Sequence, residues 1–241
     1  MEIFNYNSVE KIIENIDSIK KATDKDGFSI IRTALDIELL NACRDSVVNE
    51  FKPELDIRTS GKYTKDMKDL QRLDVGEYPS SSRLCRYFFR FPWNDNENFS
   101  KISNNLLSIR NKLSGKKSNF GKMGEDEDPK RFAISYIIHY PTGGGFMSEH
   151  REHTLKEEGD NAYVVYTTLT MKGVDFENGG GYVVLNDQRI NIDDFTKFGD
   201  IVIYRGDKFH GVESIDQHKP VNLNSVTGRL MFTTAINYFE D

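Results

Sequence analysis

The feature that most constrains the fold is a series of short β-like segments between Phe132 and Tyr238, separated by turn residues and with no helical period between them. The segments are AISYIIHY, FMSEHRE, YVVYTTLT, GYVVLN, QRINI, DIVIY, HGVESI and RLMFTTAINY. Eight strands within about 110 residues match a jelly roll. We therefore expect residues 132–241 to form a double-stranded β-helix, with its apolar positions in a core between two sheets.

The first half of the chain has a different sequence pattern. Helical spacing of apolar residues predicts helices over 8–23, with Asn7 and Glu10 as a possible capping box, and over 100–113. GFSIIRT is strand-like, and Asp36 is placed to cap another helix. We expect a mainly β protein in which residues 1–131 form a supporting layer of helices and loops.

Residues 52–82 are polar and rich in turn formers, which predicts a long loop. Such a loop serves either as a lid over a site or as plain surface chain, and the sequence does not decide between them. No internal repeat or linker divides the chain, so we expect one domain over residues 1–241.

Composition narrows the class of protein. The chain is 37% hydrophobic and 29% charged and has no apolar run long enough to span a membrane. Its N-terminus lacks the apolar core of a secretory signal, and its two cysteines suit a reducing compartment, so we expect a cytoplasmic protein. A net charge of -6 argues against nucleic acid as a partner.

The stretch YPTGGGFMSEHRE, residues 140–152, carries a candidate metal site. If it lies on a strand, His150 and Glu152 point to the same side, because successive side chains alternate faces. His210, in DIVIYRGDKFHGVES, is the best third ligand. Two histidines and one carboxylate on one face of Fe(II) leave open positions for oxygen and a co-substrate.

Other histidines fit less well. The zinc motif HExxH needs histidines at i and i+4, whereas EHREH places them at i and i+3. His153 and His139 have the wrong strand parity, and His218 lies in a polar loop. Beyond His210, Arg229 begins the last expected strand, where a guanidinium would bind a carboxylate.

Taken together, His-x-Glu, a distal His and a following Arg on eight short strands resemble the Fe(II)/2-oxoglutarate-dependent oxygenases, with the prolyl-hydroxylase and phytanoyl-CoA-hydroxylase branches closest in texture. The resemblance implies Fe(II), 2-oxoglutarate and O2 as metal and co-substrates. It also implies that Tyr140 and Arg229 hold the far carboxylate of 2-oxoglutarate, with Thr233 nearby. Glu152 argues against the related halogenases, which have a small residue at that position.

The substrate is less defined. Arg86 and Arg90 share strand parity in an aromatic run and are candidates to bind a substrate anion, although arginines covering aromatic surface are the more ordinary interpretation. The compact chain favours hydroxylation of a small polar metabolite, such as an amino acid or biosynthetic intermediate. Protein or peptide hydroxylation is one alternative, and a non-catalytic cupin-like binding module is another. The sequence does not indicate the oligomeric state.

Overall fold

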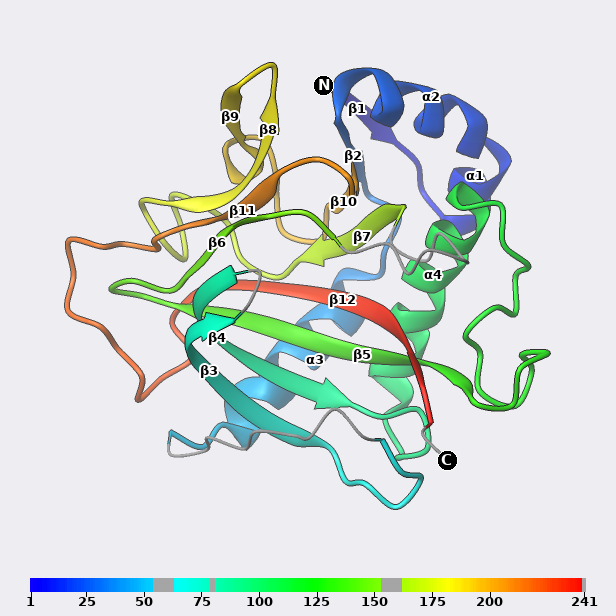
Figure 1. Cartoon of the computed structure of the whole chain (residues 1–241), viewed down its shortest axis with the longest axis horizontal. Helices are drawn as coiled ribbons and strands as arrows, with labels where there is room; N and C mark the ends of the chain where they lie inside the picture. Colours follow the sequence, from blue (N-terminus) through cyan, green and yellow to red (C-terminus); the bar gives the residue numbers. More distant parts are fainter. Residues whose placement is uncertain (54–62, 79–80, 153–161, 240–241) are drawn as a thin grey trace.

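The protein is described by a computed structural model, which places residues 1–53, 63–78, 81–152 and 162–239. The helices and strands, in chain order, are β1 (Glu2–Asn5), α1 (Val9–Glu14), α2 (Ile16–Asp26), β2 (Phe28–Arg32), α3 (Ile37–Glu50), β3 (Leu70–Tyr78), β4 (Ser81–Arg90), α4 (Glu97–Leu113), β5 (Arg131–Pro141), β6 (Phe146–His150), β7 (Tyr163–Thr168), β8 (Gly180–Leu185), β9 (Gln188–Asn191), the 3-10 turn Ile192–Asp194, β10 (Ile201–Arg205), β11 (His210–Glu213) and β12 (Gly228–Tyr238) (Figure 1).

The strands form two hydrogen-bonded layers that share β4. The major sheet runs in the order β1-β2-β10-β7-β12-β5-β4-β3, and the minor sheet contains β6, β11, β8 and β9. β4 pairs with β6 near Arg83 and with β5 from Arg86 to Arg90, so it passes from one layer into the other. All eight segments expected after Phe132 form strands, and the predicted double-stranded β-helix is confirmed.

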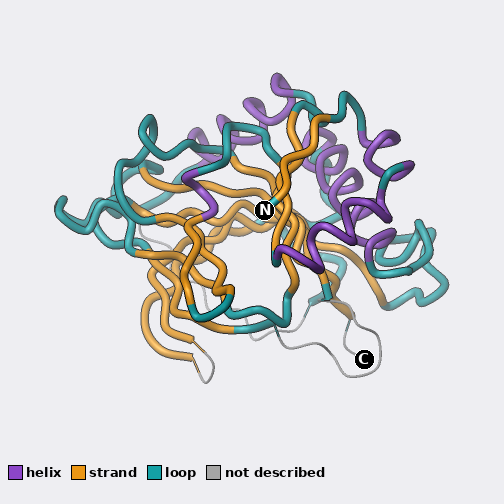
Figure 2. The backbone as a smooth tube through the Cα atoms, turned by 90° about the horizontal axis from the view of Figure 1, so that it is seen from above, coloured by secondary structure: helices purple, strands orange, loops and turns teal. Residues whose placement is uncertain are grey.

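The helices cover the outer face of the major sheet, as the view from above shows (Figure 2). Alternation along β12 separates two cores: Leu230 and Phe232 pack against the helices, whereas Met231 packs between the two sheets. Burial of both faces explains why the central strands are almost continuously apolar. The site described below lies on the inner face.

The N-terminal helices differ in detail from the expected ones. The single helix predicted over 8–23 is two helices meeting at Asn15, and its cap is Ser8, whose hydroxyl accepts the Lys11 N–H at 3.4 Å. Asp36 caps α3 as expected, accepting backbone N–H groups at 2.9 and 3.2 Å. Among the described residues, no helix is long and apolar enough to cross a membrane.

The loop predicted over 52–82 is wrong for its second half, because β3 pairs with β4 from Leu70 to Tyr78. This hairpin carries charged residues that pair with one another: Asp74 pairs with Arg72 at 2.9 Å and with Arg83 at 3.2 Å. The guanidinium of Arg72 also lies 4.9 Å from the Tyr87 ring centroid. The part of the expected lid at 54–62 lies outside the described residues.

The N-terminal half is more than a supporting layer. β1, β2, β3 and β4 all belong to the major sheet, so a boundary at residue 131 does not separate helices from sheet. β2 pairs with β10, and β4 pairs with β5, on opposite sides of the strands that carry the inner-face residues. The two halves therefore share one pair of cores.

Candidate active site

A glycine turn sets the direction of the strand that carries the first candidate ligand. β5 ends at Pro141, and the chain returns as β6 after Gly145, whose N–H donates to the Pro141 carbonyl at 2.8 Å. Gly143 has φ 90°, and a Cβ there would overlap the backbone of Pro220. Only glycine meets both requirements without strain. The turn thus fits closely against the loop before β12.

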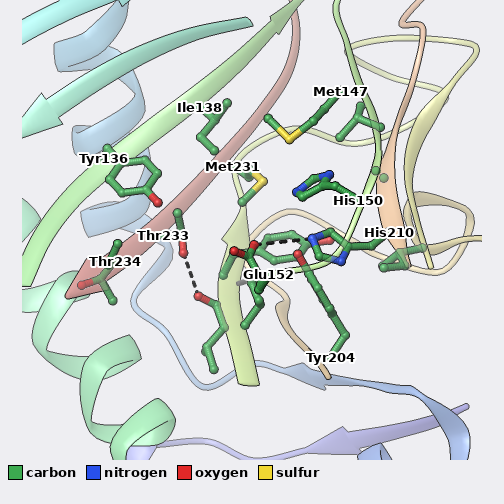
Figure 3. A pocket seen from close by; sticks show the side chains of 18 of the residues that line it. Tyr136, Ile138, Met147, His150, Glu152, Tyr204, His210, Met231, Thr233 and Thr234 are labelled. Carbon is green, nitrogen blue, oxygen red and sulfur yellow. Dashed lines mark hydrogen bonds and ion pairs between the residues drawn. The ribbon is translucent and has the colours of Figure 1, made fainter. Parts of the chain in front are cut away.

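The three predicted metal ligands come together in the structure. His150 ends β6 and is the register partner of His210 on β11, while Glu152 follows β6 and donates its N–H to the Gly206 carbonyl at 2.9 Å. One possible ligand atom from each residue lies within 4.8 Å of the other two. Figure 3 shows the two rings and the carboxylate converging on one side of the cavity, with His210 Nε2 3.5 Å from Glu152 Oε1.

The backbone orients both rings. His150 Nδ1 lies 2.8 Å from the Ser148 carbonyl, and His210 Nδ1 lies 2.9 Å from the Lys208 carbonyl. A carbonyl only accepts, so in each ring Nδ1 is the donor and Nε2 keeps its lone pair. This is the arrangement by which a second hydrogen bond fixes the tautomer of a metal-binding histidine.

Electrostatics favour the protonation states that a cation needs. Burial lowers the pKa of His150, and the neighbouring His210 lowers it further, so the ring is neutral near neutral pH. Burial alone would raise the pKa of Glu152, but the neighbouring His210 and His150 outweigh burial, and the net pKa is lowered. A neutral His150 ring beside an ionised Glu152 fits a divalent transition metal.

The second predicted group, Tyr140 and Arg229, lines the same cavity. Arg229, 2% exposed, is the register partner of Tyr140, and its guanidinium carbon lies 5.5 Å from the Tyr140 ring centroid. Its bidentate partner in the structure is Asp193, at 2.6 Å from Nε and 3.4 Å from Nη2. Burial lowers the pKa of Arg229 and the Asp193 charge more than restores it, so the guanidinium stays charged.

One nitrogen of this guanidinium has no assigned partner. Nη2 also donates to the Tyr166 hydroxyl at 3.4 Å, whereas the buried Nη1 makes no hydrogen bond within the described residues. Burial raises the pKa of the Tyr140 phenol, which therefore stays protonated as a donor. A carboxylate placed between Nη1 and the Tyr140 hydroxyl would satisfy both, so this end of the cavity fits the far carboxylate of 2-oxoglutarate.

Thr233 and the two candidate substrate arginines have other neighbours. Thr233 lines the cavity, but its hydroxyl donates to the Val165 carbonyl at 3.0 Å. Arg86 and Arg90 have the parity of Phe88, which packs against the helices, so they lie on the outer face of the major sheet. The structure therefore does not bring them to the cavity.

Each of these two arginines has contacts in the outer layer. Arg86 is fully buried and donates to the Leu223 carbonyl at 3.2 Å, with its guanidinium 4.7 Å from the Phe51 ring centroid. Arg90 pairs with Glu50 at 2.8 Å. The prediction that Arg86 and Arg90 share one face of the strand was correct. The prediction that this face borders the site was wrong, because the layer that covers the strand decides which face is the inner one.

Two of the rival histidines, His139 and His218, lie outside the cluster. His139 is fully buried on the outer face, where Nε2 donates to the Thr227 carbonyl at 2.9 Å and Nδ1 accepts from Arg86 at 3.4 Å. His218 lies at the surface, 3.7 Å from Glu177. His153 lies outside the described residues.

The cavity that joins these groups has an empty volume of about 940 Å³, part of which is open to solvent. Two of its important residues were not singled out from the sequence: Asp193, which orients Arg229, and Arg110 of α4, which lines the cavity from the helical layer. Asp193 sits in a turn between strands, and Arg110 sits in an amphipathic helix. Neither context carries a signal beyond ordinary surface charge.

The fold and the site define a jelly-roll protein whose inner cavity is lined by a His-Glu-His cluster and by a buried arginine. No protein-family model matches the sequence, and no curated protein resembles it closely enough to match.

Solved structures do resemble it. A prolyl-4-hydroxylase from Pseudomonas putida matches 94% of this chain and 100% of its own, with a TM-score of 0.55 and 13% identity. A thymine 7-hydroxylase from Neurospora crassa, solved with alpha-KG and thymine, matches 99% of this chain and 86% of its own (TM-score 0.60, 12% identity). JOX2, solved with 2OG, Fe and JA, matches 100% and 76% (TM-score 0.56, 14% identity). The chain has the fold of the 2OG-Fe(II) oxygenases.

Proposed function

We propose that this protein is an Fe(II)- and 2-oxoglutarate-dependent dioxygenase that hydroxylates a carbon of a small polar metabolite. The observation that carries the proposal is the convergence of His150, Glu152 and His210 within 4.8 Å, with both Nδ1 atoms engaged by backbone carbonyls. This donor set is the facial triad that Fe(II) oxygenases use. The likeness in fold to proteins solved with 2OG and Fe supports it.

The residues divide the work. When bound, Fe(II), 2-oxoglutarate and O2 supply the oxidation of a C–H bond to an alcohol, with succinate and CO2 as the other products. His150, Glu152 and His210 would hold the metal. Tyr140 and Nη1 of Arg229 would hold the far carboxylate of 2-oxoglutarate, while Asp193 keeps the guanidinium in place. The apolar inter-sheet walls, including Met231 and Ile138, limit water around the reacting groups.

An anaerobic titration tests the proposal. Fe(II) with 2-oxoglutarate should produce a chelate absorbance band in the wild-type protein and none in His150→Ala. Glu152→Ala should abolish succinate formation coupled to product, because the third ligand is lost. His218→Ala, which removes a surface histidine outside the cluster, serves as the matched control and should keep the band. A wild-type protein without the band, or a fully active Glu152→Ala variant, would refute the assignment.

Two alternatives make different predictions. The likeness to a prolyl-4-hydroxylase favours protein or peptide hydroxylation as the second candidate. Peptide substrates would stimulate succinate release where free metabolites do not. A non-catalytic binding module, by contrast, would form no chelate band and release no succinate. Succinate release measured with a panel of amino acids, central metabolites and proline-containing peptides separates all three.

A further inference from the structure

The cavity is not confined to the space between the two sheets. β12 pairs with β7 only from Met231 to Thr233, although β12 continues to Tyr238 and β7 begins at Tyr163. Beyond Thr233 the two strands diverge (Figure 1). The major sheet is therefore split at this point.

Residues from both faces of the major sheet border the cavity at the split. Tyr136 shares strand parity with Ile138 of the inter-sheet core, whereas Thr234 shares it with Phe232 of the outer core. Both Tyr136 and Thr234 nevertheless line the same cavity. Side chains on opposite faces border one cavity only where the sheet between them is open, so the split connects the metal-binding side with the helical layer.

Arg110 of α4 meets the cavity at this split. It is 5% exposed and lines the same cavity as the His-Glu-His cluster. Its guanidinium therefore borders the cavity from the helical layer, at the split between β7 and β12.

Two hydroxyl groups accompany this guanidinium. Thr234 Oγ1 is buried and makes no hydrogen bond within the described part of the chain. Burial raises the pKa of Tyr136, so its phenol remains a donor. A guanidinium with two hydroxyl donors is a set that recognises a carboxylate.

We infer that the split is the substrate-recognition end of the cavity, where Arg110 binds a carboxylate of the small-molecule substrate and the hydroxyls of Thr234 and Tyr136 complete the site. The inference rests on the proposed function and deepens it by naming the substrate class, a small carboxylic acid.

The two anion sites are well separated. Arg229 and Thr234 stand five positions apart on β12, which at strand spacing is about 17 Å. The carboxylate of 2-oxoglutarate, beside Arg229, and that of the substrate, beside Thr234, are thus held at different places along β12.

The test compares matched acids and amides. Succinate release is measured with the standard L-amino acids, with straight-chain carboxylic acids, and with the primary amide of each. We expect at least one acid to stimulate release with a kcat/KM about 10- to 100-fold above that of its amide, the effect of one hydrogen-bonded charge. Arg110→Gln should bring the acid-to-amide ratio close to one, and Arg110→Lys should restore part of it. Lys112→Gln, an exposed position on the same helix, should keep the wild-type ratio.

The outcomes separate the two proposals. Absence of the anaerobic Fe(II)/2-oxoglutarate band in the wild type would overturn the proposed function and the inference with it. With the band present, the inference alone is overturned if no acid stimulates, if amides serve as well as acids, or if Arg110→Gln keeps the wild-type ratio. Should Arg110→Gln fail to fold, the acid-to-amide ratio of the wild type and of Arg110→Lys still decides.

Discussion

Tyr140→Phe is the most direct probe of the 2-oxoglutarate end of the cavity. The substitution removes one hydroxyl and leaves the ring beside Arg229. Because Asp193 already takes Nε and Nη2 of Arg229, the incoming carboxylate has Nη1 and the Tyr140 hydroxyl as its donors. A hydrogen bond to a charged group contributes about 1.5–3 kcal/mol, so the affinity for 2-oxoglutarate should fall by roughly 10- to 100-fold.

The assay is an anaerobic titration of 2-oxoglutarate into the Fe(II)-loaded protein, followed by the chelate band. The Tyr140 hydroxyl makes no hydrogen bond within the described residues, so the melting temperature should change by no more than about 2 °C. Tyr6→Phe, outside the cavity against the outer core, is the matched control and should bind 2-oxoglutarate normally. An affinity for Tyr140→Phe within about twofold of the wild type would show that this hydroxyl does not bind the co-substrate.

Three further predictions follow from buried groups. Gly181→Ala would place a Cβ 2.8 Å from Arg229 Nη2, so we expect 2-oxoglutarate binding to weaken by about 10-fold, of the order of one charged hydrogen bond; unchanged binding would mean that the guanidinium can shift freely. Burial lowers the pKa of His139 from 6.5 to about 4, so the unfolded chain takes up this proton first and stability is lost as pH falls between those values, by about 3 kcal/mol in total. Chemical denaturation across this range should show a steeper pH dependence for the wild type than for His139→Gln, and equal slopes would contradict the assignment. Burial raises the pKa of both thiols, Cys43 and Cys85, to about 12, so neither should react with a disulfide reagent at mildly alkaline pH until the protein unfolds, which a thiol titration with and without denaturant measures.

The sequence predicted best where local pattern and architecture coincide. Alternation and turn residues located all eight strands after Phe132. His150 and Glu152 converge on one side as expected, although β6 ends at His150 and Glu152 follows it. β3 was missed because its charged residues find partners on β4, where Arg83 pairs with Asp74 and the Tyr87 ring lies against Arg72, and a single segment does not reveal such partners.

The sequence also did not show on which face of the major sheet a given side chain lies. The alternation of side chains along a strand predicts that Arg86 and Arg90 share a face. Only the packing of α3 and α4 against the sheet decides that this face is the outer one. The same reason hides Arg110, because its position at the cavity depends on the split between β7 and β12. A split in a sheet is a relation between strands far apart in sequence, which no local pattern records.

Arg110 lies on a different kind of element from the candidate metal ligands, a helix instead of a paired strand. The candidate metal ligands His150 and His210 lie on strands that pair within the minor sheet, β6 with β11 and β11 with β8. Residue 110 stands on a helix that packs against the barrel from outside and enters no strand register. Selection for a different substrate could therefore act on the α4 face alone, changing what the cavity accepts while the strands that hold the reactive centre stay as they are.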